Sequence, residues 1–435
     1  MSSGVLIPYF TQLEGRRTLA WQGRVTQVVG NLVESVGPPC SLGECCEIHD
    51  SGGRVYSGEV VGFRGSTVLT LPLEKPSGVR FGDAVFARGE RPSLAVGEGL
   101  LGRVIDGAAK PLDGLGPYAA RQRQILDCSA PSALARLPIR EPLGCGVRAI
   151  DGFLTCGRGQ RLGIFGGSGV GKSTLLGMMA RGTAADLTVL ALVGERGREV
   201  GEFLESLGEE GRRRSVVVVS TSDQSPLLRI RAALAATSIA EYFCHACRNV
   251  LLVVDSLTRF AMAQREIGLA AGEPPTAKAY TPSVFSMLAR LVERAGRFAG
   301  GSITAFYTVL MEGDDQQDPL VDALRSLVDG HIVLDRRLAA QNHYPPISIL
   351  DSLSRLMPSV ASREHLAKSQ QLRSLLSAYA KSEDLIRIGA YSKGADPVLD
   401  NAIAVLPELQ GFLRQSPDDR APVADTLARL STIAC

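Results

Sequence analysis

Short runs in which apolar and polar residues alternate fill the first part of the chain. They lie at residues 24–29, 45–48, 56–61, 67–71 and 83–86. Turn signals rich in glycine, such as 50–53 and 64–65, separate them. Alternation with a period of two is typical of strands with one buried face, and several short strands in succession indicate a sheet that closes on itself. The pattern predicts a small β-barrel over 23–91, preceded by an N-terminal segment, 1–22.

A different pattern follows, in which wholly apolar runs recur between segments with helical spacing. The runs cover residues 161–165, 187–193, 215–220, 249–254, 302–309 and 331–334. Such alternation favours a parallel sheet covered by helices. We therefore predict an α/β core over 92–357, which begins with a stretch rich in turn formers, 97–114. Helical periodicity at 371–379 and 401–413 predicts a small helical domain over 358–435.

One apolar run of the predicted core breaks into glycines and then opens a helix. The stretch from Gly166 to Ser173 fits the pattern G-x-x-x-x-G-K-[ST]. Glycines let the backbone wrap a phosphate chain with its N–H groups, and a helix N-terminus attracts the same anion. We predict a P-loop that binds a nucleoside triphosphate with magnesium, in which Lys172 reaches the β and γ phosphates and the Ser173 hydroxyl is a ligand of Mg²⁺. The alternative is a turn that binds nothing. The predicted nucleotide-binding residues here are Gly166, Gly167, Ser168, Gly169, Val170, Gly171, Lys172, Ser173 and Thr174.

Two carboxylates stand at the ends of other apolar runs. Asp255 directly follows the run 249–254, and Glu195 comes two residues after the run 187–193. Because the carboxyl ends of neighbouring parallel strands meet at one edge of a sheet, we expect Asp255 on the magnesium side of the phosphates and Glu195 beside the attacking water. Each acid has an alternative explanation. The alternative for Asp255 is a cap of the next helix, and the alternative for Glu195 is a solvated charged turn that also contains Arg196, Arg198 and Glu199.

Charge and composition narrow the classes of function. The chain has 47 Lys and Arg against 45 Asp and Glu, a net charge of +2, which gives no general attraction to nucleic acid or to an acidic membrane. Apolar runs such as 250–254 are too short to cross a bilayer, and the first residues lack a basic segment followed by an apolar one. We therefore expect a cytoplasmic protein.

The nine cysteines are scattered along the chain and predict reduced thiols rather than a disulfide framework. Cys244 and Cys247 flank His245 with a spacing that metal ligands use. No second pair follows at a zinc-like distance. The alternative is that Cys244 packs on a helix ahead of the next strand.

Further stretches resemble one protein family over nearly the whole chain. They lie at residues 101–107, 146–151, 193–200, 272–276, 282–285, 291–296, 301–310, 312–319 and 329–334. The chain is similar there to the ATPases that energise flagellar and virulence-type type III protein export, which are relatives of the catalytic subunit of rotary ATP synthases. Stretches 166–172 and 229–243 resemble the flagellar branch more closely. The resemblance implies an α/β fold: a RecA-like P-loop core with a parallel sheet, between an N-terminal β-barrel and a C-terminal helical domain.

The resemblance also implies a role for each matching residue of the site. Lys172 and Ser173 bind the triphosphate and Mg²⁺, and Asp255 is the aspartate on the magnesium side. Glu195 is the catalytic glutamate, and Arg196 supports it. The P-loop, Glu195 and Asp255 of one site come from one subunit of a ring.

Three further residues complete the implied site. Arg259 braces the cluster around Asp255, and Tyr344 matches the aromatic residue that stacks on adenine. Arg355 matches the arginine finger, which in this family acts on ATP held by the neighbouring subunit. A guanidinium is always charged and forked, as the equatorial oxygens of a transferring phosphoryl group require. Without the family, Arg355 is equally well explained as half of a surface ion pair.

The chain departs from the family pattern at three positions. Pro346 stands where the family usually has Ala, and Ala279 and Thr281 replace the more usual Gly and Pro. By the resemblance, Pro346 is near the nucleotide pocket and affects the fit of the base, and Ala279 and Thr281 are near the interior of the ring.

The implied function is ATP hydrolysis by a hexameric ring that energises protein export, including chaperone release and substrate unfolding. Implied partners are further copies of the chain, stalk and stator proteins, the export gate and chaperone–substrate complexes. The chain is expected at the cytoplasmic face of the inner membrane, held there by partners, and nucleic acid is not an expected ligand. The rival functions are a virulence-type export ATPase, a non-catalytic ring subunit, and a ring-shaped RNA translocase. The non-catalytic subunits of the family usually lack the carboxylate at Glu195.

Overall fold

The computed structural model describes residues 21–311 and 318–434 of the 435-residue chain. Residues 1–20 of the predicted N-terminal segment and 312–317 of a family motif lie outside the described residues. The chain forms two compact units: Met1–Ser93 with Ile267–Glu273, and Leu94–Glu266 with Pro274–Cys435. Among the described residues, no helix combines the length and the apolar character needed to span a bilayer.

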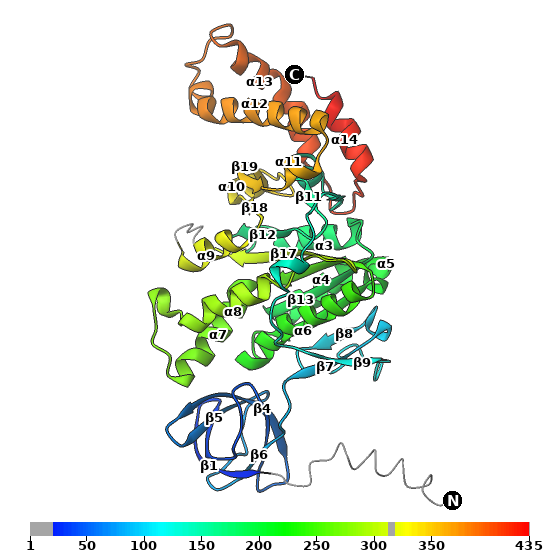
Figure 1. Cartoon of the computed structure of the whole chain (residues 1–435). Helices are drawn as coiled ribbons and strands as arrows, with labels where there is room; N and C mark the ends of the chain where they lie inside the picture. The colour runs from blue at the N-terminus through cyan, green and yellow to red at the C-terminus, as the bar shows by residue number, and fades with distance from the viewer. Residues whose placement is uncertain (1–20, 312–317, 435) are drawn as a thin grey trace, which may run out of the picture. The chain divides into compact units, whose positions relative to one another are not determined.

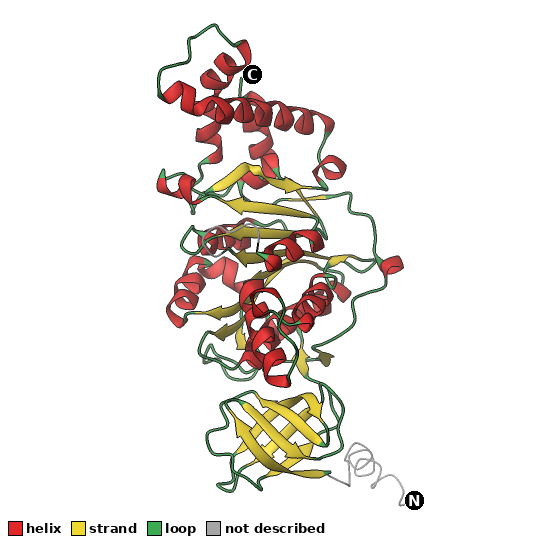
Figure 2. Cartoon of the chain, turned by 90° about the vertical axis from the view of Figure 1, so that its left-hand side faces the viewer, coloured by secondary structure: helices red, strands yellow, loops and turns green. Residues whose placement is uncertain are grey.

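The N-terminal strands form a closed barrel in the order β1-β2-β5-β4-β3-β6, which confirms the predicted barrel (Figure 2). Alternate apolar side chains, among them Val25, Ile48 and Val85, fill its interior. The sequence pattern missed β2 because a buried position of this strand is polar: Ser35 donates from its hydroxyl to the Gly37 carbonyl at 2.7 Å. The strands are β1 (Gln22–Val29), β2 (Leu32–Val36), β3 (Cys45–His49), β4 (Val55–Arg64), β5 (Thr67–Pro72) and β6 (Ala84–Ala87).

The second unit is built on one sheet in the order β19-β18-β12-β17-β15-β13-β14-β8 (Figure 1). All neighbours in this path are parallel except β19 and β18, and a short strand, β16, pairs antiparallel with β17. The six predicted core strands are confirmed. The strands are β8 (Val104–Asp106), β12 (Arg161–Gly166), β13 (Leu187–Glu195), β14 (Ser215–Thr221), β15 (Asn249–Asp255), β16 (Gly296–Arg297), β17 (Ser302–Leu310), β18 (Gly330–Leu334) and β19 (Ile347–Ser354).

Helices cover both faces of this sheet. Helix α6 packs against one face of β13, β14 and β15. On the opposite face, the alternate side chains of these strands belong to the same hydrophobic cluster as α3. Because both faces are buried, the central strands are almost wholly apolar, as in other parallel sheets. The helices of this part are α2 (Arg148–Phe153), α3 (Lys172–Gly182), α4 (Gly197–Ser206), α5 (Gly208–Arg213), α6 (Pro226–His245), α7 (Leu257–Ala271), α8 (Pro282–Val292), α9 (Pro319–Leu327), α10 (Arg336–Ala340) and α11 (Met357–Val360).

Shorter elements connect the main ones. They are the 3₁₀ turns η1 (Glu98–Leu100), η2 (Ala133–Ala135) and η3 (Ala277–Ala279), and the paired strands β7 (Ser93–Val96) with β9 (Gln122–Ile125) and β10 (Pro142–Leu143) with β11 (Cys156–Gly157). Ala279 has a φ of 59°, in the left-handed region that glycine adopts without steric cost. The departure from the family's usual Gly at this position therefore carries backbone strain, of about 1 kcal/mol.

Three helices follow the sheet and form the predicted helical domain: α12 (Arg363–Arg387), α13 (Pro397–Leu413) and α14 (Val423–Thr432) (Figure 1). A buried arginine, Arg148 of α2, ties this domain to the core because its Nε donates to the Phe412 carbonyl at 2.8 Å. The amide of Gln415 does the same: its Oε1 accepts from the Arg148 N–H and its Nε2 donates to the Gly146 carbonyl.

The Cys244 and Cys247 pair does not form a site in this structure. Cys244 is buried on α6, and Cys247 is exposed beyond the end of that helix. In the two described stretches of the chain, no group of three or more His, Cys, Asp or Glu side chains is arranged to hold a metal ion. Cys244 therefore has the packing role that was its alternative.

Candidate functional site

The predicted P-loop is a tight connection between β12 and α3. The loop needs glycine at two positions for conformational reasons, since Gly169 has a φ of 76° and Gly171 one of 99°. Lys172 is the first residue of α3 and is buried, and its Nζ donates to the Gly167 carbonyl at 3.0 Å. The ammonium therefore lies back over the loop, where the phosphates of a nucleotide bind in this motif. Ser173 and Thr174 are exposed beside it.

The two predicted carboxylates end adjacent strands of the sheet. Asp255 is the last residue of β15 and Glu195 the last of β13, and these strands are hydrogen-bonded neighbours. Thr308 donates from its hydroxyl to Asp255 Oδ1 at 2.5 Å, and Arg259 Nη2 lies 3.4 Å from Glu195 Oε2. Both acids influence Lys172: burial lowers the pKa of its ammonium, and the carboxylates oppose that shift. The structure thus brings together the lysine and both acids.

Burial also changes the acids themselves. It raises the pKa of Asp255, which is fully enclosed, although the Thr308 hydrogen bond opposes the shift. The pKa of Glu195 is raised to about 8, first by burial, then by the negative charge of Asp255 and by a hydrogen bond with Glu199. The same hydrogen bond lowers the pKa of Glu199. The role of Glu199 was missed because only the fold shows that it faces Glu195.

The two arginines near Glu195 differ in position. Arg259, on α7, is the one that pairs with Glu195. The Arg196 side chain is 76% exposed and lies 3.5 Å from Glu199 instead. The structure therefore does not place Arg196 against the glutamate that the resemblance implies it supports.

The residues present fit a magnesium ion. Ser173 offers a hydroxyl at the start of α3, and Asp255 offers a carboxylate whose Oδ1 is oriented by Thr308. Hard oxygen donors of this kind are what Mg²⁺ prefers, usually as one or two protein ligands beside substrate phosphates.

Tyr344 lies against the P-loop of its own chain. A Cβ added at Gly171 would lie 3.5 Å from the Tyr344 ring, and the ring is 40% exposed. It borders a cavity of about 140 Å³ that is lined by apolar atoms. The remaining lining residues are Gly171, Thr174, Leu175, Met178, Pro345, Pro346, Gln415 and Pro417. The cavity has the character of a base-binding site, and the departure at Pro346 lies in its wall.

Part of this wall comes from beyond the sheet. Gln415, after α13, donates its backbone N–H to the Tyr344 carbonyl at 2.8 Å and thus fixes the aromatic residue. Sequence reasoning missed Gln415 and Pro417 because no motif surrounds them and they lie about seventy residues after Tyr344.

Arg355 lies near the amino-terminal end of the parallel strands, whereas the P-loop lies at their carboxyl-terminal end. It follows β19, whose last residue, Ser354, pairs with Gly330 at the start of β18. Since β18 runs parallel to β12, Gly330 is level with Leu162, and Gly166 is four residues further along. At about 3.3 Å per residue the separation along the strands is about 13 Å. The finger of one chain therefore lies far from the P-loop of the same chain.

The guanidinium of Arg355 is exposed, and within residues 21–311 and 318–434 no hydrogen bond or ion pair of its side chain is found. Its backbone is fixed, because its N–H donates to the Asp329 carbonyl at 3.0 Å. A surface ion pair, the alternative for this residue, is not what the structure shows. The side chain is free to meet another molecule.

Three family models match the chain in the order of its domains. The β-barrel domain of the ATP synthase alpha/beta family matches residues 25–89, and the nucleotide-binding domain of that family matches 146–354. The T3SS EscN ATPase C-terminal domain matches 361–432. The predicted fold class is thereby confirmed in all three parts.

Individual relatives are similar over nearly the full length. The flagellum-specific ATP synthase of Bacillus subtilis is 51% identical, with 94% of this chain and 94% of the relative covered. The SPI-2 type 3 secretion system ATPase of Salmonella typhimurium is 50% identical, with 91% of each covered. The assembled ATPase EscN of the enteropathogenic E. coli type III secretion system has the same fold, with a TM-score of 0.90, 44% identity, and 94% of this chain and 99% of that chain covered. The chain belongs to the flagellar and type III secretion ATPases of the ATP synthase alpha/beta family, and it is an ATP-binding enzyme of protein export.

Proposed function

We propose that this chain hydrolyses ATP at sites shared between neighbouring copies in a ring, and that the flagellar export apparatus uses the energy. The position of Arg355 carries the proposal, because it lies near the amino-terminal end of the parallel strands and the P-loop lies at their carboxyl-terminal end. A complete site then needs two copies that meet head to tail, and a head-to-tail interface that closes generates a ring. The relative EscN, described as assembled, supports this arrangement, and we infer six copies.

In this mechanism the P-loop N–H groups and Lys172 hold the phosphates of ATP, and Glu195 accepts a hydrogen bond from the water in line with the γ-phosphate. Arg259 orients Glu195 through their ion pair. Ser173 and Asp255 would hold Mg²⁺, which would supply positive charge beside the phosphates of the nucleotide. Arg355 of the next copy meets the charge that develops on the transferred group.

The proposal extends to the setting of the enzyme. The flagellum-specific relatives favour the flagellar branch over the virulence branch. The EscN relative is also known in complex with its central stalk EscO, and we infer a corresponding stalk protein here. Stator proteins, the export gate and chaperone–substrate complexes are the other proposed partners, with chaperone release and substrate unfolding as the work done. The enzyme then lies in the cytoplasm, at the inner membrane through these partners.

The shared site is tested by the ATPase rate as a function of protein concentration. Since the finger arrives only on assembly, we expect the rate per chain to rise with concentration and then level off. A rate per chain that stays constant while sedimentation shows a change from monomer to ring contradicts the proposal. Added RNA is the control for the rival translocase, and it should leave the curve unchanged.

Replacing Tyr344 by alanine should weaken ATP binding by about tenfold, because stacking on a base contributes about 1–3 kcal/mol. The matched variant Tyr344→Phe keeps the ring and should bind as tightly as the original chain. Calorimetric titration with ADP measures both. Equal affinity of Tyr344→Ala and the original chain would place the base elsewhere than in the cavity beside this ring.

A further inference from the structure

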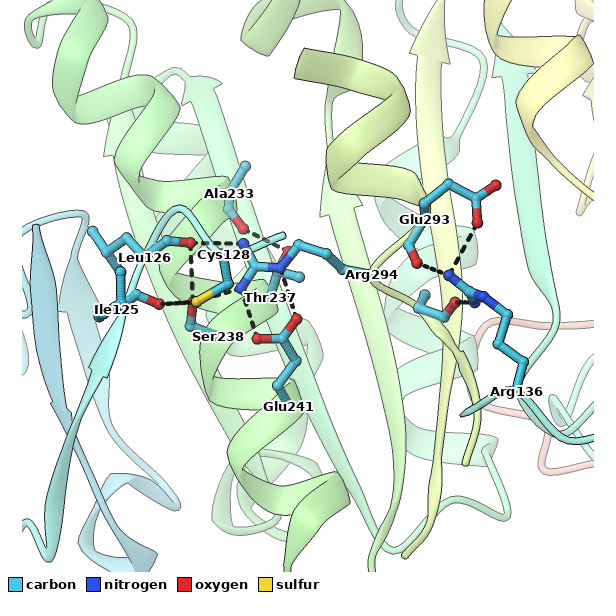
Figure 3. A network of polar contacts seen from close by, with 11 residues as sticks. Ile125, Leu126, Cys128, Arg136, Ala233, Thr237, Ser238, Glu241, Glu293 and Arg294 are labelled. Carbon is cyan, nitrogen blue, oxygen red and sulfur yellow. Dashed lines mark hydrogen bonds and ion pairs between the residues drawn. The ribbon is translucent and has the colours of Figure 1, made fainter. Parts of the chain in front are cut away.

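A short strap, defined as residues 129–135, crosses the surface of the core between two anchors. Its first anchor is the segment before it, where the Leu126 carbonyl accepts from Nη1 of the buried Arg294 at 2.7 Å (Figure 3). Arg294 is fixed in turn by Glu241, with 2.7 Å from its Nε to the Glu241 Oε1. The hydroxyl of Ser238 also donates to the Ile125 carbonyl at 3.1 Å.

The second anchor follows the strap directly. Arg136 pairs with Glu293, with 3.0 Å between Nη2 and Oε2, and donates to the Ala295 carbonyl (Figure 3). Leu137 donates its N–H to the Arg297 carbonyl at 2.9 Å. Figure 3 shows Glu293 directed toward Arg136, and Arg294, the next residue, directed away from it toward Leu126. The strap is therefore held at both ends by one segment of the chain.

Between these anchors the strap is exposed to solvent. Residues 132–135 are all exposed, and Leu134, in the middle of η2, has 97% of its surface in contact with solvent. An exposed leucine on a mobile terminus is unremarkable, but this one is held out from a fixed backbone. A backbone that is already held at both ends loses little entropy when another surface covers the side chain that it carries.

The strap is continuous with the edge of the sheet that carries the finger. Glu293, which holds Arg136, also lies 2.7 Å from Arg161 Nη1 at the start of β12. Arg161 binds Asp329 through two hydrogen bonds, and the Asp329 carbonyl accepts the N–H of Arg355. An unbroken path of ion pairs and hydrogen bonds thus joins the strap to Arg355.

From this continuity we propose that the strap is a contact surface for a second copy of this chain, with Leu134 buried against the copy whose ATP receives Arg355. The inference rests on the proposed function, because it takes the finger edge as the face that meets the neighbour. The inference goes beyond the proposed function in two respects. It assigns Leu134 as the apolar anchor of the interface, and it predicts that the strap affects assembly of the ring and not the chemical step.

The test replaces Leu134 by aspartate and measures the ring by mass photometry and the ATPase rate as a function of concentration. Buried apolar anchors at the centre of an interface are often hot spots, so the concentration that gives half of the maximal rate per chain should rise by about tenfold or more. The maximal rate at saturating protein should change little. The matched control is Ile388→Asp, an equally apolar side chain that is 75% exposed near the end of α12, and it should assemble like the original chain.

A photo-crosslinking amino acid at position 134 gives an independent readout in the otherwise unchanged chain. We expect crosslinks to a second copy, dependent on assembly. Crosslinks confined to the same chain, or Leu134→Asp rings that form at the original concentration, overturn the inference. This failure is distinct from failure of the shared site. The shared site is tested by the ATPase rate of Arg355→Ala in assembled rings, and that result does not depend on the outcome at position 134.

Discussion

Replacement of Arg355 by alanine is expected to lower the maximal ATPase rate by about 10³–10⁵-fold, the range in which arginine fingers contribute to phosphoryl transfer. ATP binding should persist, because Lys172 and the rest of the P-loop lie about 13 Å away along the strands of the same chain. The fold of the chain should also persist, since the exposed guanidinium makes no hydrogen bond or ion pair within the described part of its own chain. The rate is measured at a protein concentration that saturates assembly.

Mixing two inactive variants separates a finger in the neighbour from one in the same chain. Lys172→Ala cannot hold ATP but carries an intact Arg355, whereas Arg355→Ala has an intact P-loop. In an equal mixture about one interface in four pairs an intact P-loop with an intact finger, because each interface takes one half-site from each copy. Activity should therefore reappear on mixing. A mixture as inactive as its components would reject the shared site.

Replacement of Glu195 by glutamine is expected to reduce turnover by about 10²–10⁴-fold, the usual contribution of a positioned general base. The amide keeps the shape of the side chain but no longer accepts the proton of the attacking water. Burial and the neighbouring Asp255 raise the pKa of Glu195 to about 8, which makes this carboxylate a stronger base than an ordinary glutamate. Affinity for ATP, measured by titration, should be unchanged.

The control for this variant is Glu199→Gln, which alters the other carboxylate of the pair. Its loss of turnover should be far smaller, because Glu199 acts only through its hydrogen bond to Glu195. The pH dependence supplies a second readout. Only the ionised Glu195 accepts a proton, so kcat/KM of the original chain should rise as the pH approaches about 8 and then level off. Normal turnover by Glu195→Gln would remove this residue from the mechanism.

The sequence alone predicts the parts of this fold whose pattern is local. The glycines of the P-loop, the apolar central strands and the acids that end β13 and β15 follow from short-range rules, and the structure confirms the strand, loop and helix context of Lys172. Strand β8 was missed because it has three residues inside a stretch of turn formers, and β19 because it is an antiparallel edge strand with an irregular pattern of burial.

The parts that sequence reasoning could not supply depend on contacts between distant segments. No sequence motif near Gln415 indicates that its backbone N–H binds the Tyr344 carbonyl. Likewise, the sequence of the charged turn after β13 does not indicate that Arg259, rather than Arg196, pairs with Glu195. The same holds for the strap, whose anchor Arg294 lies more than 150 residues away. Ion pairs of this kind are fixed by the topology of the sheet, and only the folded chain shows them.

Strand β19 has a consequence for communication around a ring. Tyr344 precedes the strand and touches the P-loop of its own chain, and Arg355 follows the strand on the far side. In the proposed ring, this strand of eight residues therefore links the nucleotide site of its own chain, at Tyr344, with the site of the neighbouring copy, at Arg355. The proposed ring therefore predicts that nucleotide exchange at one site affects hydrolysis at the next, because both sites depend on residues that flank β19.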